Sequence, residues 1–538
     1  MCLSVRFSAV IYFLFCVSAN PQVTLPTDVS KKGIYCSYSP KPDDWSKSSV
    51  PPSPNNISFD PDSECDFYVR AEEMFSWLTS PPKAGSGYIF TSPLFHGVSP
   101  AQKNGRRLFQ EPGVAGIFDV ALSQLGSNDV PTVFDNEGRP HNLVRPKYIL
   151  NDVGSRIAIQ RARTRSPASS DLPLFFDTNG KEIKYNAFPT MFDFKLNRIA
   201  PSVNAQMILA NGARYPLDMN GNAIDYGVGQ AKTKAALMTQ GRRLVYYGIL
   251  VNDVYAYYHK SMPDTVPRGF PTTKTEIDAL SMKYGYSFPD AEALAVAVKT
   301  SWIEAEDDEK DRYLTIDAEI PIYRRYSKYC MEYKKKKRHA TLALVGMHVA
   351  FSAKEQPKMI WATFEHVDNS RGRPYLYFTD RAEEPQPYED GEGMWLFSKD
   401  GDDDKDVEYN VPRMGVDKIG NIVGEGGAGD CHKHSKYQKS IGASDIRRDH
   451  AWGSDESKEN TNTIRINTGF MEKLPIGDAR RNYIMVGTTW FGAFESIVGA
   501  TKLANSTMET FISESQCLSC HNDPRLSHIW KQLQRLPK

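Results

Sequence analysis

Two apolar runs in the second half of the chain limit its fold most tightly. Residues 342–351 read LALVGMHVAF and residues 359–367 read MIWATFEHV, and both are rich in β-branched and aromatic side chains. Residues 352–358 separate the two runs and include Pro357. Short apolar runs bounded by a turn are typical of buried strands. We therefore predict that they form two central β-strands.

Other segments predict further strands and a few helices. Asp/Asn-Gly turns at 134–138, 176–180 and 217–221 each precede a short alternating segment, which favours β-hairpins. Residues 483–488 resemble another strand. Composition and period predict helices over 64–79, 234–258 and 501–513. The basic run 334–338 favours a solvated loop before a strand over a site for an anionic partner.

The first residues have the pattern of a secretory signal peptide. Met1–Ala19 contains one positive charge, Arg6, then an apolar run over 7–17 and the small-residue ending Val17-Ser18-Ala19. The run is too short to span a bilayer, which needs about 20 apolar residues. Two alternatives are an uncleaved anchor and a lipid on Cys16, although the large Phe15 precedes that cysteine. Cleavage would remove Cys2 and Cys16.

Charge and composition exclude several classes of protein. The 538 residues contain 65 Lys+Arg and 65 Asp+Glu, so the chain lacks the basic surplus typical of a nucleic-acid binder. Hydrophobic residues at 40% argue against global disorder. No later segment is long and apolar enough to span a membrane, so we expect no integral span in the mature chain.

The string Cys517-Leu518-Ser519-Cys520-His521 carries the most specific chemistry in the chain. This C-x-x-C-H spacing is the attachment signature of c-type haem. The two thiols can form thioethers to the porphyrin vinyl groups, and the adjacent imidazole can bind the iron as the proximal ligand. We predict one covalent haem c held by Cys517, Cys520 and His521. Export fits this interpretation, because covalent haem attachment takes place outside the bacterial cytoplasm.

Two alternatives for the same string stay open. Cys517 and Cys520 could form a thioredoxin-like redox pair, although no βαβ pattern surrounds them. They could also supply ligands to a zinc site that Cys431, His432 or His434 completes.

The second axial ligand, if the iron has one, is expected upstream of the motif. No methionine follows His521, and His528 is expected to be peripheral. The candidates are Met347, His348, His366 and Met508, followed by His432, His434 and His450. A hydrogen-bonded core histidine is the ordinary alternative for His348 and for His366. Glu365 alternates to the other face of the strand from His366, so it should not orient that ring.

The chain resembles a family of exported bacterial proteins that are labelled cytochrome c family proteins. The resemblance covers roughly residues 70–525 and lies in the segments ALVGMHVAF, PKMIWATFEHVDN, VAVKTSW, LANSTMETF and CLSCH. It implies a periplasmic location, one covalent haem, thioether sites at Cys517 and Cys520 and an iron ligand at His521. It names no reaction.

These observations together predict an α+β fold, with a β-rich central body and a helical C-terminal haem-attachment segment. The expected organisation is a signal peptide at 1–19, a Pro/Ser-rich arm at 20–82, a body at 83–500 with room for two subdomains that meet near 335, and the haem segment at 501–538. Cys36, Cys65, Cys330 and Cys431 remain for at most two disulfides, and Cys36 and Cys65 could pair after export.

The expected function is single-electron transfer in the periplasm by a monohaem c-type cytochrome-like protein. The partner would be a redox protein or a small-molecule oxidant or reductant, and no catalytic residue is assigned. Two alternatives are a haem-dependent oxidoreductase of the peroxidase or oxidase type, and a haem-based sensing or binding protein. The length of the body favours the haem-dependent oxidoreductase, because an electron carrier does not need about 500 residues.

Overall fold

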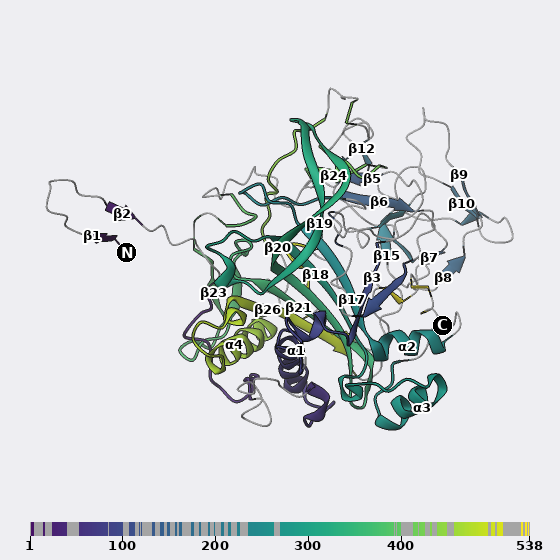
Figure 1. Ribbon diagram of the computed structural model, residues 1–538, viewed down its shortest axis with the longest axis vertical. Coiled ribbons are helices and arrows are strands. Elements are labelled where there is room, and N and C mark those ends of the chain that lie inside the picture. Colours follow the sequence, from purple (N-terminus) through teal and green to yellow (C-terminus); the bar gives the residue numbers. More distant parts are fainter. Residues whose placement is uncertain are drawn as a thin grey trace.

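A computed structural model gives the fold (Figure 1). It describes residues 24–39, 53–83, 85–100, 107–112, 118, 120, 235–262, 269–391, 393, 395–399, 413–417, 419–424, 431–432, 438–448, 457–492, 497–500, 503–508, 529–530, 533–534 and 536, together with short backbone strands within 2–16 and 132–225. The predicted signal peptide lies mostly outside the described residues. So do Cys517, Cys520, His521, His434, His450 and His528.

An 11-stranded sheet forms the centre of the molecule. Its main path runs β27-β26-β21-β20-β18-β17-β3-β4, and β19, β24 and β25 join through β20. Every pairing in this sheet is antiparallel. The strands are β3 (Phe95–Val98), β4 (Phe109–Pro112), β17 (Tyr246–Asn252), β18 (Val296–Glu304), β19 (Thr315–Ser327), β20 (Cys330–Ala353), β21 (Gln356–His366), β24 (Met414–Val416), β25 (Ile422–Gly424), β26 (Tyr483–Phe491) and β27 (Ile497–Gly499).

The two apolar runs form neighbouring strands in the middle of this sheet, as the prediction of central strands requires. They lie in β20 and β21, which pair with His348 opposite Thr363 and Gly346 opposite Glu365. The strand predicted at 483–488 is also present, as part of β26, which pairs with β21. Both faces are largely buried along the two apolar runs and along β26, which explains why these sequences are almost continuously apolar.

Helices α1 (Glu64–Leu78) and α4 (Ser457–Lys473) cover one face of the sheet (Figure 1). Phe75 of α1 stacks on Phe364 of β21 with ring centroids 4.4 Å apart, and Phe67 stacks on Trp490 of β26 at 4.3 Å. Each stacked pair of this kind is worth about 0.5–1.5 kcal/mol beyond the burial of its two rings. A disulfide between Cys36 and Cys65 ties the N-terminal arm to the start of α1.

Two apolar clusters lie against the opposite face. The α2-side cluster includes Val251, Ala297, Ala350 and Trp361 of the sheet, and it continues into α2 (Asp253–Ser261) and α3 (Lys274–Tyr284). The Met508 cluster includes Val245, Tyr247, Ile303, Val345 and Met508. The sheet is therefore packed on both faces, and the second face carries two separate apolar clusters rather than one.

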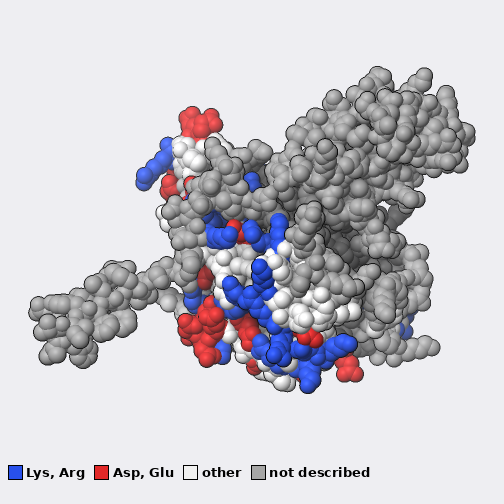
Figure 2. Space-filling model, turned by 90° about the horizontal axis from the view of Figure 1, so that it is seen from above, with Lys and Arg blue, Asp and Glu red and all other residues white. Residues whose placement is uncertain are grey.

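Strands β19 and β20 extend together as a long two-stranded arm. The basic run 334–338, predicted as a loop, lies inside β20, where Arg338 pairs with Ile320 and Lys337 with Pro321. The prediction failed because the arm is solvated, so a strand there tolerates charged side chains. Arg338 forms an ion pair with Glu304 (2.6 Å), and Figure 2 shows basic and acidic side chains side by side on the described part of one face.

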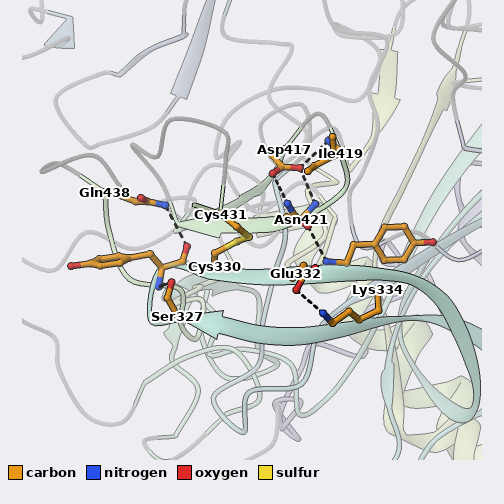
Figure 3. The surroundings of a disulfide bond; sticks show 11 residues. Ser327, Cys330, Glu332, Lys334, Asp417, Ile419, Asn421, Cys431 and Gln438 are labelled. Carbon is orange, nitrogen blue, oxygen red and sulfur yellow. Dashed lines mark hydrogen bonds and ion pairs between the residues drawn. A yellow bond between two sulfur atoms is a disulfide. The ribbon is translucent and has the colours of Figure 1, made fainter. Parts of the chain in front are cut away.

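A second disulfide joins Cys330, at the start of β20, to Cys431 (Figure 3). Around it, Asp417 accepts hydrogen bonds from the backbone of Ile419 and Asn421, both at 2.9 Å. Asn421 in turn accepts a hydrogen bond from the backbone N–H of Tyr333 on β20. The disulfide and these hydrogen bonds hold the described parts of 413–432 against the sheet.

The predicted fold class is wrong in its helical part. The described chain is dominated by antiparallel sheet with four α-helices, and none of these lies after residue 500. Residues 503–508, predicted as the start of a helix, form a turn. Asn505, Ser506 and Thr507 favour this outcome, because short polar side chains hydrogen-bond to nearby backbone and compete with the helix.

The helix predicted over 234–258 is also wrong for most of its length. Residues 246–252 form β17, and α2 begins only at Asp253. The Asn252 side chain accepts a hydrogen bond from the N–H of Tyr255, which caps the first turn of α2. The tertiary pairing of β17 with β18 and β3 overrides the local helical pattern.

Two of the three predicted hairpins are present. Strand β5 pairs with β6 and β10 with β11, whereas β15 pairs with β14 and β16 with β6, so the third turn does not close a hairpin. The remaining strands are β1 (Cys2–Ser4), β2 (Leu14–Cys16), β5 (Thr132–Phe134), β6 (Pro140–Val144), β7 (Tyr148–Leu150), β8 (Arg156–Ala158), β9 (Arg161–Arg163), β10 (Leu174–Phe176), β11 (Glu182–Ile183), β12 (Phe192–Asp193), β13 (Arg198–Ile199), β14 (Gln206–Ile208), β15 (Arg214–Pro216), β16 (Ala223–Asp225), β22 (Tyr375–Tyr377) and β23 (Gln386–Tyr388).

Candidate functional site

A polar band crosses the sheet face that the two apolar clusters cover. Paired residues of neighbouring strands point to the same face, so the register defines rows across the sheet. The first row is Ile249, Lys299, His348 and Thr363, and the second row is Tyr247, Ser301, Gly346 and Glu365. Along β18, the band lies between Ala297 of the α2-side cluster and Ile303 of the Met508 cluster.

The second row binds the turn at 503–508. Ser301 and Thr507 share a hydrogen bond of 2.5 Å between their hydroxyls, and the Tyr247 hydroxyl donates to the carbonyl of Thr507 at 2.8 Å. Asn505 donates to the carbonyl of Phe364 at 3.1 Å. The turn therefore lies directly on the polar side chains of the sheet, and its ends reach both apolar clusters through Leu503 and Met508.

Glu365 is the buried acid of the second row. Its two carboxylate oxygens accept hydrogen bonds from the backbone N–H and the hydroxyl of Ser506, each at 2.7 Å. Burial raises the pKa of Glu365, while the charge of Arg448 and the hydrogen bonds from Ser506 and Asn369 act in the opposite direction. The hydrogen bonds from Ser506 thus attach the turn at 503–508 to this buried carboxyl group.

The first row lies beside the docked turn and is partly accessible. His348 and Ile249 are partly exposed, although they lie in the middle strands of the sheet. Lys299, between them in the row, is 3% exposed. The alternation in VAVKTSW already separates Lys299 and Ser301 from the apolar positions, and this is the sequence signal that could have identified the band.

Thr363 sets the orientation of the His348 ring. The Thr363 hydroxyl lies 2.5 Å from Nδ1 of His348 and donates to the carbonyl of Leu503 at 3.4 Å. The hydrogen bond between this hydroxyl and Nδ1 fixes the orientation of the ring on the polar band. Metal-binding histidines are commonly oriented by a hydrogen bond of this kind at the other ring nitrogen.

His366 has the properties of a core histidine. Its Nε2 donates to the carbonyl of Arg312 at 3.1 Å, and its Nδ1 accepts from the backbone N–H of Asp368 at 3.2 Å. Burial lowers its pKa to about 3, and the ring stacks on Tyr313 with centroids 3.8 Å apart. As expected, Glu365 lies on the other face of β21 from His366, because successive residues of a strand point to opposite faces. Glu365 pairs with Ile484 of β26, and His366 pairs with Tyr483.

The two methionine candidates lie in apolar clusters. Met347 is fully buried on the sheet face that α1 and α4 cover, opposite to the polar band. Met508 is fully buried in the Met508 cluster. A fifth candidate in the described chain, His432, is exposed and packs against Tyr326 with ring centroids 4.8 Å apart. Of these five described candidates, only His348 combines partial exposure with a place on the polar band.

The disulfides account for four of the eight cysteines. Cys36 pairs with Cys65 and Cys330 with Cys431, so Cys431 has no thiolate to offer a zinc ion. Within the described residues, no group of three or more His, Cys, Asp or Glu side chains could hold a metal ion. A zinc site that uses Cys431 as a ligand is therefore excluded.

The chain is anchored on both sides of the segment that contains the C-x-x-C-H string. Met508 fixes one end in the Met508 cluster, and Ile529 and Trp530 fix the other end in the α2-side cluster. Trp530 packs against Tyr255 and Phe270, with centroids 5.6 and 5.2 Å apart, and its carbonyl lies 3.1 Å from Nε2 of His259. Residues 509–528 connect these two anchors, and the polar band lies between the two clusters.

In the described part of the chain, none of the helices has the length and apolar character that a membrane span requires. Comparisons of the chain with protein-family models, with curated proteins and with solved structures find no match.

Proposed function

We propose that this protein is an exported monohaem c-type cytochrome-like protein that transfers single electrons through a haem bound to Cys517, Cys520 and His521. The observation that carries the proposal is the C-x-x-C-H string in a chain whose other mature cysteines pair with one another. A covalent haem supplies one-electron chemistry between its ferrous and ferric states.

Two features of the described residues support this proposal. A polar band with a partly exposed, oriented imidazole lies between the two anchors of the motif segment. Apolar side chains flank the band on both sides, as a largely apolar macrocycle with polar edges requires. The chain itself would bind the haem through two thioethers, orient it through the anchors at Met508 and Trp530, and limit water around it.

The disulfides support the periplasmic location. Two disulfides in a chain of this size are typical of an oxidising compartment, and the signal-peptide pattern at 1–19 agrees with export. The resemblance to exported cytochrome c family proteins points the same way. The redox partner would then be a periplasmic protein or a small-molecule oxidant or reductant.

A haem stain of a denaturing gel tests the proposal. The full chain would be expressed in a bacterial host competent in cytochrome c maturation, and the periplasmic fraction compared with that of the double variant C517S/C520S. We expect a stained band for the wild type and none for the variant. An unstained wild-type band of normal abundance would overturn the proposal. Binding of CO to the reduced protein would instead favour the haem-dependent oxidoreductase or sensor.

A further inference from the structure

We propose that the end of the β19–β20 arm is a docking surface for an anionic lipid bilayer. The arm tip is defined here as residues 322–336 with their described neighbours at 417, 419–424 and 431–432. In Figure 1 the arm extends from the sheet to the top of the view. The docking surface does not involve the haem, so it goes beyond the proposed function and stands or falls independently of it.

The arm concentrates positive charge in a chain that is neutral as a whole. Residues 319–338 contain eight Lys and Arg against two Glu, whereas the full chain contains 65 Lys+Arg and 65 Asp+Glu. Glu332 neutralises Lys334 at 2.6 Å. Among the described residues, no acid forms an ion pair with the exposed side chains of Arg324, Arg325, Lys335 and Lys336. Their charges are therefore available to an anionic partner.

A bulge in the arm presents part of this charge to solvent. The pairing of β19 with β20 shifts between Pro321 and Tyr323, so Ile322 alone lies opposite residues 334–336. Within the bulge, Lys335 has a φ of 52°, in the left-handed region that few residues other than glycine adopt. Bulges re-aim side chains and interrupt regular pairing. Here the bulge leaves consecutive lysines exposed.

An exposed aromatic ring lies beside the charged groups. The side chain of Tyr326 is 51% exposed, and its ring centroid lies 4.8 Å from that of His432. The hydrogen bond from Lys334 lowers the pKa of Glu332, and the charges of His432 and Arg324 act in the same direction. These groups therefore gather around one carboxylate, with the tyrosine ring among them.

A second exposed apolar side chain lies in the turn between β24 and β25. Ile419 is 67% exposed. In the same turn, Asn421 accepts a hydrogen bond from the backbone N–H of Tyr333 at 2.9 Å, and the Cys330–Cys431 disulfide ties this end of the arm together (Figure 3). The tip is thus ordered before it binds, which lowers the entropic cost of docking.

The combination of charge and apolar exposure favours a bilayer over other anionic partners. Clusters of Lys and Arg attract anionic headgroups, and each charge near the surface strengthens binding roughly 5-fold. Tyrosine rings favour the headgroup level, and aliphatic side chains enter the boundary with the acyl chains. A partner recognised by charge alone would leave Tyr326 and Ile419 in water, whereas a bilayer accommodates both.

Vesicle sedimentation of the mature full-length protein tests the proposal. Vesicles of phosphatidylcholine alone are compared with vesicles that also contain phosphatidylglycerol. Binding is measured at about 0.1 M and about 1 M NaCl, which changes the Debye length from about 10 Å to about 3 Å. We expect the protein to sediment with the anionic vesicles only, and far less at the higher salt concentration.

Three double variants separate the contributions. K335Q/K336Q should bind the anionic vesicles roughly 25-fold more weakly, because two charges are removed. Y326S/I419S should bind more weakly at both salt concentrations, because salt does not screen apolar contacts. The matched control K354Q/K473Q removes two exposed lysines away from the arm, at the β20–β21 turn and at the end of α4, and should bind as the wild type does.

Each contrary result has a definite meaning. Equal sedimentation of the wild type with both kinds of vesicle, or equal weakening in K335Q/K336Q and the control, would overturn the proposal. Binding to polyglutamate but not to vesicles would overturn it in favour of an acidic protein partner. Release by sodium phosphate beyond that by NaCl of equal ionic strength would overturn it in favour of a free-phosphate site. If a double variant does not accumulate, R324Q and R325Q take its place, and wild-type binding by both would overturn the proposal.

Discussion

Gly346 has no side chain, and this allows the turn at 503–508 to lie close against β20. A Cβ atom at this position would lie 2.6 Å from the hydroxyl oxygens of both Ser301 and Thr507, and 2.8 Å from the Asn505 oxygen. We predict that G346A lowers the free energy of unfolding by about 1–3 kcal/mol, as overpacking of a tight core does. Urea unfolding measures the change.

The control for this prediction is G442A. A Cβ atom at Gly442 meets no atom within 4 Å, so this variant should unfold at the wild-type urea concentration. Equal midpoints for G346A and G442A would show that the turn is not held against β20 as described.

The sequence could name candidate ligands but could not rank them. His348 and His366 both lie in apolar runs, and the sequence around each does not distinguish them. Their difference comes from tertiary contacts, because the carbonyl of Arg312 and the N–H of Asp368 satisfy His366, whereas a threonine on the neighbouring strand orients His348. The register of β20 and β21 brings Thr363 to His348, whereas Arg312 reaches His366 from outside both strands.

At the scale of elements, helix α1 carries a buried acid that couples its stability to pH. Glu73 is paired with Arg70, with Nε and Oε2 3.3 Å apart, yet burial dominates and raises the pKa of Glu73 to about 7. The folded state therefore binds a proton more tightly than the unfolded chain, in which the pKa is 4.5. This contribution is fully present below the unfolded pKa and is lost as the pH rises through about 7.

We predict that E73Q flattens the pH dependence of stability. The free energy of unfolding of the wild type should fall between about pH 4 and about pH 8, and the variant should lose less, by about 3 kcal/mol at most. Urea titrations at both pH values measure this, with E355Q at the exposed β20–β21 turn as control. A wild-type slope in E73Q would contradict the account of α1.

The disulfide between Cys36 and Cys65 makes a separate prediction for the N-terminal arm. It closes a loop of sequence separation 29, so we expect the double variant C36S/C65S to lose about 2–4 kcal/mol of stability. The Cys330–Cys431 disulfide stays intact in this variant. Thermal unfolding of the two proteins side by side measures the effect, and coincident curves would show that this disulfide adds nothing to the stability of the fold.

Periodicity predicted the elements whose burial is regular and missed those that tertiary contacts decide. The runs in β20, β21 and β26 are apolar because both of their faces are covered. A few consecutive residues of sequence are enough to identify such a run as a buried strand. In contrast, β17 was mistaken for a helix because its strand character depends on pairing with β18 and β3. The turn at 503–508 was mistaken for a helix because Glu365, far away in sequence, binds Ser506.

At the scale of the whole molecule, the sheet has two unlike faces. One apolar cluster covers the face under α1 and α4, whereas the opposite face carries the polar band between two apolar clusters. Met508 lies in one of these clusters and Trp530 in the other, so the proposed haem segment connects the two clusters along the chain.

The intact mass of the mature protein, purified from a host competent in cytochrome c maturation, tests the central claim most directly. We predict the mass of residues 20–538 with two disulfides plus the mass of one haem, and the loss of the haem mass in C517S/C520S. A wild-type mass that equals the bare polypeptide would contradict the claim that Cys517 and Cys520 bind haem.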